Sequence, residues 1–306
     1  MLYLFYLFNV IINVVNNMNG AFFIDKEINC TSRDVVNEII KKVETNKVGH
    51  TGTLDPIATG VLVVCVGKAT KLVNLLTCEN KVYEAEITLG IQTDTYDITG
   101  NIIKELPVNI SDDEINKVVN SFLGEYEQEV PIYSAVKVNG KKLYEYARNN
   151  IDVKLPKRLV SIDDIKIISD IKRIDNHIVF SIRVSVSKGT YIRALVNDIA
   201  HKLNTVGVMS SLRRIKLGNV NISDCKSIDD VSFSDLVSIK DLLKDYYSYI
   251  VDDDLKKDIL NGKIIDNVYN SDRVVFYDKD DKVLALYKMY EKDNTKIKPE
   301  VMFGGV

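Results

Sequence analysis

The sequence is poor in the residues that build metal centres and disulfide scaffolds. Its 306 residues include only four cysteines and three histidines. The cysteines are far apart, none forms a Cys-x-x-Cys pair, and the histidines complete no zinc-binding pattern. We therefore expect reduced thiols in a cytoplasmic protein, and we predict no metal site.

A long uninterrupted apolar run is also missing. Residues 1–17 are mostly apolar and aromatic, but Asn9 and Asn13 interrupt them, and the stretch is too short to span a bilayer. It has no basic region and no small-residue cleavage site, so it is a poor signal peptide. Met18 looks like a natural start. We expect residues 1–17 to be an extension outside the fold, and we expect no membrane contact.

The chain has no large excess of charge of either sign. Its net charge of −3 argues, taken alone, against a nucleic-acid partner. The charges are unevenly distributed, however, because residues 224–254 carry nine aspartates against three lysines. Residues 131–158 instead combine seven lysines and arginines with three tyrosines. Such a basic, aromatic stretch can bind phosphates and bases, or it can simply be a solvated loop and helix face.

The apolar pattern predicts strands and helices that are mixed without regular alternation. Strands are expected at 20–25, 61–66, 83–89, 178–186, 273–277 and 283–287, and helices at 35–43, 72–76, 115–122, 192–203 and 255–260. This order favours an α+β fold over a doubly wound sheet.

One carboxylate, Asp55, occupies the middle of a glycine-spaced loop. Pro56 forces Asp55 into an extended conformation, and Gly52 and Gly60 permit a tight loop around it. The apolar run 61–66 that follows is a buried strand in our interpretation. A single acid at the end of a rigid element suggests covalent or acid–base chemistry, although an Asp-Pro pair alone can merely shape a turn.

The whole stretch 49–71 resembles the nucleophile loop of the bacterial tRNA pseudouridine-55 synthases, the TruB family. Further matches follow in the family's order, at Lys81-Val82-Tyr83, residues 92–100, 131–137, 140–148 and 187–193, and Leu212-Arg213-Arg214. The resemblance runs in one register from about Gly20 to Arg214. The first loop departs from the family pattern, because Glu27 follows Lys26 where the family usually has proline, and Cys30 replaces a methionine.

This resemblance implies a fold and a reaction. The fold is a catalytic domain at 18–249, with a mixed, mostly antiparallel central sheet and flanking helices, followed at 250–306 by a small β-rich, PUA-like RNA-binding module. The tail could instead be a solubilising appendage. The reaction converts uridine 55 in the T-arm of tRNA to pseudouridine. Because this isomerisation adds and removes nothing, no cofactor is expected; a monomer without protein partners is implied.

The resemblance also assigns roles to individual residues. Asp55 is the nucleophile, at C1′ or at the base, Tyr83 stacks on the flipped uracil and can move a proton, and Arg193 keeps Asp55 ionised. Without the family match, Tyr83 could be a core residue and Arg193 a surface residue. RNA contacts are implied for His50, Lys26, Asp94, Lys137, Lys141, Lys142, Tyr191, Arg213 and Arg214, with His50 as the wedge that replaces the flipped base; a loop histidine can also be merely exposed.

Three other functions can be compared with the motifs of this sequence. Ser134 and Lys137 fit the Ser-x-x-Lys motif of acyl-serine hydrolases, but the companion motifs of those enzymes are missing. A P-loop fails because position 62 is leucine and position 69 is alanine. A non-catalytic RNA-binding protein on the same scaffold would show the same basic surface, and tritium release from C5-labelled uridine RNA separates it from an enzyme.

Overall fold

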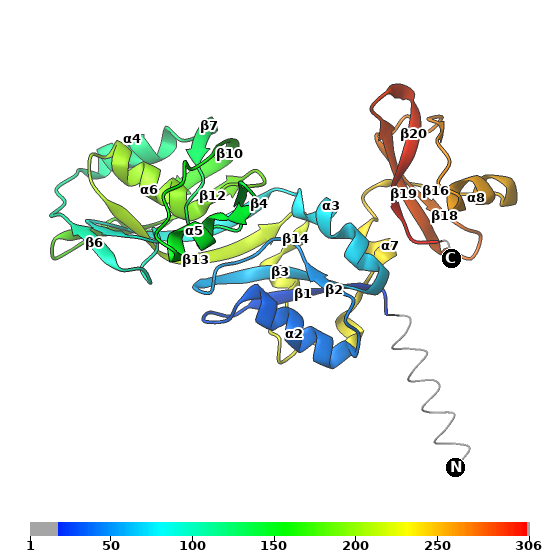
Figure 1. The fold of residues 1–306 in the computed structure, drawn as a ribbon, viewed down its shortest axis with the longest axis horizontal. Coiled ribbons are helices and arrows are strands. Elements are labelled where there is room, and N and C mark those ends of the chain that lie inside the picture. Colours follow the sequence, from blue (N-terminus) through cyan, green and yellow to red (C-terminus); the bar gives the residue numbers. More distant parts are fainter. Residues whose placement is uncertain (1–17, 305–306) are drawn as a thin grey trace, which may run out of the picture.

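A large sheet organises the computed structural model, which describes residues 18–304 (Figure 1). The predicted extension at 1–17 lies outside the described residues. The sheet runs β15 (Val237–Ser238), β1 (Gly20–Lys26), β3 (Ala58–Val66), β13 (Gly207–Leu217), β4 (Lys81–Leu89), β12 (His177–Val186), β10 (Lys157–Ile167), β7 (Gly124–Glu129). Only the β3–β13 pair on this path is parallel. The prediction of an α+β fold with a mostly antiparallel sheet is confirmed.

Short strands complete this part of the molecule. Three of them pair with strands of the main path: β2 (Val48–His50) with β3, β11 (Lys172–Ile174) with β12, and β14 (Val220–Asn221) with β13. Two small hairpins stand apart from the main sheet, β5 (Ile91–Thr93) with β6 (Ile102–Glu105) and β8 (Lys137–Val138) with β9 (Lys141–Lys142).

The helices cover the sheet with their apolar sides. Helix α2 (Ser32–Val43) begins at a capping box in which Thr31 and Asp34 bond each other's backbone, and it packs on β1 and β3. Helices α4 (Asp112–Asn120) and α6 (Ile192–Lys202) pack over β4, β12 and β10. The remaining short helices are η1 (Gly67–Leu72), α3 (Val73–Thr77), α5 (Leu143–Arg148), η2 (Ile222–Asp224), η3 (Phe233–Asp235), α7 (Ile239–Leu242) and α8 (Asp253–Leu260).

The acidic segment 224–254 is built into the fold. Its strand β15 pairs with β1 at the edge of the large sheet, and Lys226 forms an isolated β-bridge with Ile24 of β1. Several of its carboxylates are used locally: Asp235 pairs with Lys226 at 2.7 Å, and Asp241 accepts a bond from the Ser238 hydroxyl before α7. The segment therefore closes a sheet edge and joins the two sheets of the molecule.

A second, five-stranded sheet forms the C-terminal part and curls into a half-barrel, consistent with a PUA-like module (Figure 1). Its order is β16 (Tyr247–Ile250), β18 (Arg273–Tyr277), β19 (Val283–Tyr290), β20 (Asp293–Met302), β17 (Ile265–Asp266). The strands expected at 273–277 and 283–287 and the helix at 255–260 are present. Strand β16 begins three residues before the predicted boundary at 250.

The C-terminal sheet shares a hydrophobic core with the large sheet. Val275, Leu286 and Val301 belong to the same buried cluster as Val61 and Val63 of β3. Two lysines of η1 add polar contacts, because Nζ of Lys68 donates to the Phe303 carbonyl at 2.7 Å and Nζ of Lys71 donates to the Met302 carbonyl at 2.6 Å. The second sheet is thus held against the first by apolar packing and by hydrogen bonds.

Gly60 is a point where the sheet tolerates no side chain. Its φ is +100°, and a Cβ there would lie 2.2 Å from the carbonyl oxygen of Arg214 on β13. We expect Gly60→Ala to lower the free energy of unfolding by about 2–5 kcal/mol, because it adds backbone strain and forces β3 and β13 apart. Urea denaturation measures this loss.

Gly124 supplies the matched control for that prediction. It has nearly the same φ, +99°, but a Cβ added there would meet no atom within 4 Å. Gly124→Ala should therefore cost only the backbone strain, about 1 kcal/mol. Equal losses in the two variants would show that the close approach of β13 does not matter.

Candidate active site

Segments that are distant in sequence line a cavity of about 480 Å³ beside the N-terminus of α6. They include the loop before β3, the start of β4, the segment between β7 and β8, the turn between β12 and α6, and part of β13. Asp55, Tyr83 and Arg193, the three catalytic residues of the sequence prediction, all line this cavity. The fold therefore brings together side chains that are up to 138 positions apart.

Hydrogen bonds at both ends hold the loop that carries Asp55. The Ser32 hydroxyl, at the start of α2, accepts a bond from the Leu54 amide at 2.9 Å, and the Leu54 side chain is buried in the main core. On the other side, the Ala58 amide donates to the Asp55 carbonyl at 3.0 Å where β3 begins. These contacts hold the Asp55 backbone in place. The Asp55 side chain is 37% exposed and lines the cavity.

Arg193 is a buried residue that pairs with Asp55. Its Nε lies 2.9 Å from Asp55 Oδ2, and only 7% of its side chain is exposed. Nη1 donates to the Thr95 carbonyl and Nη2 to the Tyr133 carbonyl, both at 3.0 Å. The surface-arginine alternative is thus excluded by the structure. A guanidinium fixed in this way can hold the neighbouring carboxylate in one orientation.

A second carboxylate, Asp97, belongs to the same group of charges. Its Oδ2 lies 3.7 Å from Nη1 of Arg193, and the residue is 5% exposed. The other oxygen, Oδ1, accepts bonds from the amide and hydroxyl of Thr99 and from the hydroxyl of Thr95. Sequence reasoning gave Asp97 no role, although it lies in the matched segment 92–100. The structure makes it the second acidic partner of Arg193.

Tyr83 lies at the boundary between the core and the cavity. It is 7% exposed, belongs to the main hydrophobic cluster and also lines the cavity. Its neighbours across the sheet are Val184 on β12 and Arg214 on β13. Core packing fixes the position of the ring, and the cavity gives a planar ligand access to it.

The chain is similar to known proteins along almost its whole length. A family model described as "TruB family pseudouridylate synthase (N terminal domain)" matches residues 40–192. The curated tRNA pseudouridine synthase B of Bacillus subtilis (strain 168) is 40% identical over 298 residues, which cover 92% of this chain and 96% of that protein. The Staphylococcus aureus (strain MSSA476) protein of the same name is 42% identical, covering 93% and 99%. The chain belongs to the TruB family of pseudouridylate synthases.

Solved structures show the same fold for this TruB-family synthase. A Cbf5–Nop10–Gar1 complex matches with a TM-score of 0.66 and 23% identity, covering 95% of this chain and 85% of that chain. An H/ACA RNP bound to a substrate RNA containing 2′-deoxyuridine matches with a TM-score of 0.65 and 22% identity, covering 96% and 87%. At this level of identity the likeness concerns the fold alone.

Buried cations line the wall of the cavity in this synthase. Lys81 is 7% exposed, and burial, together with the charge of Arg214, lowers its pKa to about 8. Its Nζ donates to the carbonyls of Thr77 and Glu79. Arg214 is 1% exposed and donates from Nε to the Val61 carbonyl and from Nη2 to the Gly52 carbonyl. Arg214 therefore supports the Asp55 loop and gives the cavity positive charge, with few atoms open to RNA.

The other predicted RNA-binding residues near the cavity come mainly from one hairpin. Lys137 and Lys141 are exposed on β8 and β9, and Lys142 lies over the ring of Tyr144 at 5.4 Å. Tyr144 and Tyr191 both line the cavity. The hairpin thus presents cations next to aromatic rings, which suits a nucleic-acid surface.

His50 is half-buried on β2 and does not line the cavity. Its Nδ1 is buried and has no hydrogen-bond partner among residues 18–304. Burial, assisted by the charge of Arg214, lowers the pKa of the imidazole. The ring is therefore not the simply exposed loop histidine of the alternative interpretation.

Three predicted RNA contacts are engaged elsewhere in the fold. Lys26 is fully buried, and its Nζ donates to the carbonyls of Glu27 and Cys30. Arg213 forms a two-bond ion pair with Asp25, at 3.1 and 2.6 Å. Asp94 accepts bonds from the Asn101 amide and side chain and so closes the turn after β5. In this structure the three side chains bond to neighbouring protein groups, and their RNA contacts stay predictions.

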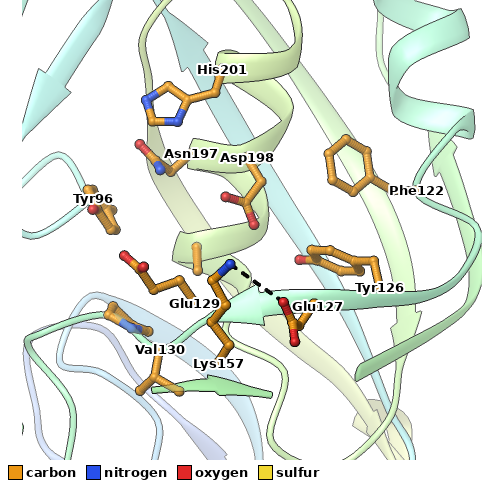
Figure 2. Close-up of a pocket in the computed structure, with 12 residues that line it drawn as sticks. Tyr96, Phe122, Tyr126, Glu127, Glu129, Val130, Lys157, Asn197, Asp198 and His201 are labelled. Carbon is orange, nitrogen blue, oxygen red and sulfur yellow. Dashed lines mark ion pairs between the residues drawn. The ribbon is translucent and has the colours of Figure 1, made fainter. Parts of the chain in front are cut away.

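A second, acidic pocket lies along α6 (Figure 2). Glu127 and Glu129 of β7 face Asp198 of α6 across it, and Lys157 pairs with Glu127 at 3.5 Å. Burial raises the pKa of Asp198 to about 6. None of the residues predicted to bind or convert RNA lines this pocket.

None of the helices between residues 18 and 304 is long and apolar enough to cross a membrane.

Proposed function

We propose that this synthase converts uridine 55 in the T-arm of tRNA to pseudouridine, with Asp55 as the nucleophile. The observation that carries the proposal is the buried Arg193 guanidinium, 2.9 Å from the Asp55 carboxylate, in a cavity that Tyr83 also lines. The tRNA substrate follows from the name of the curated relatives, which are about 40% identical over almost the whole chain.

The reaction requires one glycosidic bond to break and one carbon–carbon bond to form. The uracil leaves its stack, at a cost of a few kcal/mol, and enters the cavity, where the Tyr83 ring stacks on it. The ionised Asp55 then attacks either C1′ or the base, the N1–C1′ bond breaks, and the uracil turns. When C5 bonds to C1′ and loses its proton, Asp55 is released unchanged. Arg193 holds the carboxylate in place throughout.

The surroundings of the cavity suit an RNA hairpin. The β8–β9 hairpin supplies exposed lysines for phosphates, and Lys81 adds a charge inside the cavity. The C-terminal half-barrel extends the surface away from the cavity, and we assign it to contacts with the rest of the tRNA. We propose that the enzyme acts as a monomer in the cytoplasm, in keeping with its four free cysteines.

Tritium release from C5-labelled RNA tests this function. We expect purified protein to release one tritium per molecule from a tRNA transcript, and also from a short hairpin with the T-arm sequence. Replacing uridine 55 with cytidine should remove the signal, because the target base is then absent. Release that survives this replacement would disprove the position, whereas binding without any release would favour a non-catalytic RNA-binding protein.

A further inference from the structure

Ser134 is a polar residue of the active-site cavity that the proposed reaction leaves unused. It is 6% exposed and lines the cavity with Asp55, Tyr83 and Arg193. Its Oγ is buried and has no hydrogen-bond partner in the described part of the chain. A buried hydroxyl without a partner costs about 1–3 kcal/mol, so a protein rarely keeps one unless a ligand completes it.

The backbone around Ser134 is held firmly next to the reacting carboxylate. The preceding carbonyl, that of Tyr133, accepts the bond from Nη2 of Arg193, the partner of Asp55. The Ser134 amide donates to the Ile132 carbonyl at 2.9 Å, and its carbonyl accepts from the Tyr144 amide at 3.1 Å. Ser134 therefore directly follows the residue whose carbonyl binds Arg193. Its own amide and carbonyl are both hydrogen-bonded, so its backbone is fixed in place.

The surroundings of Ser134 do not support the hydrolase alternative. A serine nucleophile needs a base that accepts its proton, and the Ser134 hydroxyl has no such acceptor among the residues described. The lysine of the Ser-x-x-Lys motif, Lys137, is exposed on β8. The hydroxyl is therefore available as a hydrogen-bonding group rather than as a reactant.

We propose that Ser134 binds the target nucleoside through a hydrogen bond from its hydroxyl to an oxygen of that nucleoside, the ribose 2′-hydroxyl or the uracil O4. A hydroxyl can donate to either oxygen. The inference rests on the proposed function, since it assumes that the flipped nucleoside occupies this cavity. It adds a substrate contact that positions the nucleoside against Asp55.

The first experiment compares Ser134→Ala with the wild-type protein on C5-tritiated tRNA. We expect kcat/KM to fall roughly 3- to 10-fold, the value of one neutral hydrogen bond. The melting temperature should stay the same or rise, because the variant removes an unsatisfied buried hydroxyl. Ser121→Ala is the control: its exposed hydroxyl caps the end of α4 by donating to the Val118 carbonyl at 2.6 Å, and it should leave kcat/KM unchanged.

The second experiment identifies the oxygen that Ser134 contacts. Binding of T-arm hairpins is measured in the Asp55→Asn background, with uridine, 2′-deoxyuridine or 4-thiouridine at the target position. The weaker binding caused by Ser134→Ala should disappear with the analogue that lacks the contacted oxygen and persist with the other. A loss of affinity of the same size on all three hairpins, together with a lower melting temperature, would overturn the contact and indicate a structural role.

The two proposals fail in different ways. If the wild-type protein releases no tritium, the proposed function fails. If it releases tritium and Ser134→Ala matches it in kcat/KM, only the Ser134 contact is disproved.

Discussion

Asp55→Asn is expected to abolish turnover, lowering kcat roughly 10⁴-fold or more, as the loss of a nucleophile does in other enzymes. The amide has nearly the same shape as the carboxylate but cannot attack as an anion. The fold should survive, because Arg193 keeps its bonds to the carbonyls of Thr95 and Tyr133 and its ion pair with Asp97. Single-turnover tritium release measures the loss.

The same preparation should still bind RNA within about threefold of the wild-type affinity, since only one half-buried hydrogen-bonding group is changed. Asp112→Asn provides the control, because it removes the carboxylate of another ion pair, with Arg173 at 2.6 Å on the surface, and should leave turnover unchanged. Turnover by Asp55→Asn close to that of the wild type would refute the nucleophile assignment.

Arg193→Ala is the second variant for which we expect a large effect. It leaves two carboxylates, Asp55 and Asp97, with no cation between them, and it removes the donor from two half-buried carbonyls. We expect kcat to fall about 10²- to 10³-fold from the lost positioning of Asp55. Stability should fall by about 3–5 kcal/mol, as it does when one partner of a buried pair is removed.

Arg193→Lys separates the charge of Arg193 from its positioning bonds. It keeps the charge but cannot reach four acceptors at once, so kcat should fall less than in Arg193→Ala. Single-turnover tritium release measures both variants. If the folded Arg193→Ala protein turns over like the wild type, the ion pair has no part in the reaction.

The parts of the fold that the sequence predicted are those with a clean apolar period. Strands β4 and β12 alternate buried and half-buried residues along most of their length, so both were recognised. Strand β13, at the centre of the sheet, was not, because Arg213, Arg214 and Lys216 interrupt its apolar pattern. Arg214 can be buried because it donates hydrogen bonds to the carbonyls of Val61 and Gly52. The sequence alone does not reveal those two acceptors.

The candidate active site was also predictable only in part. The family motifs pointed to Asp55, Tyr83 and Arg193, and the structure places all three in one cavity. Asp97 was missed because residues 92–100 look like an ordinary polar turn until Arg193, almost a hundred positions later, packs against them. The burial of Lys26 was not predictable either, because a basic residue in a matched segment is not necessarily exposed.

The shared core beneath the half-barrel has a consequence for how the protein melts. Apolar residues of β3, β18, β19 and β20 lie in one buried cluster, and the lysines of η1 donate to the carbonyls of Met302 and Phe303 at the end of β20. Detaching the half-barrel would expose that cluster to water, at about 25 cal/mol for each Å² of apolar surface. Cooperativity therefore extends across both sheets, and heating is expected to unfold the two in a single transition.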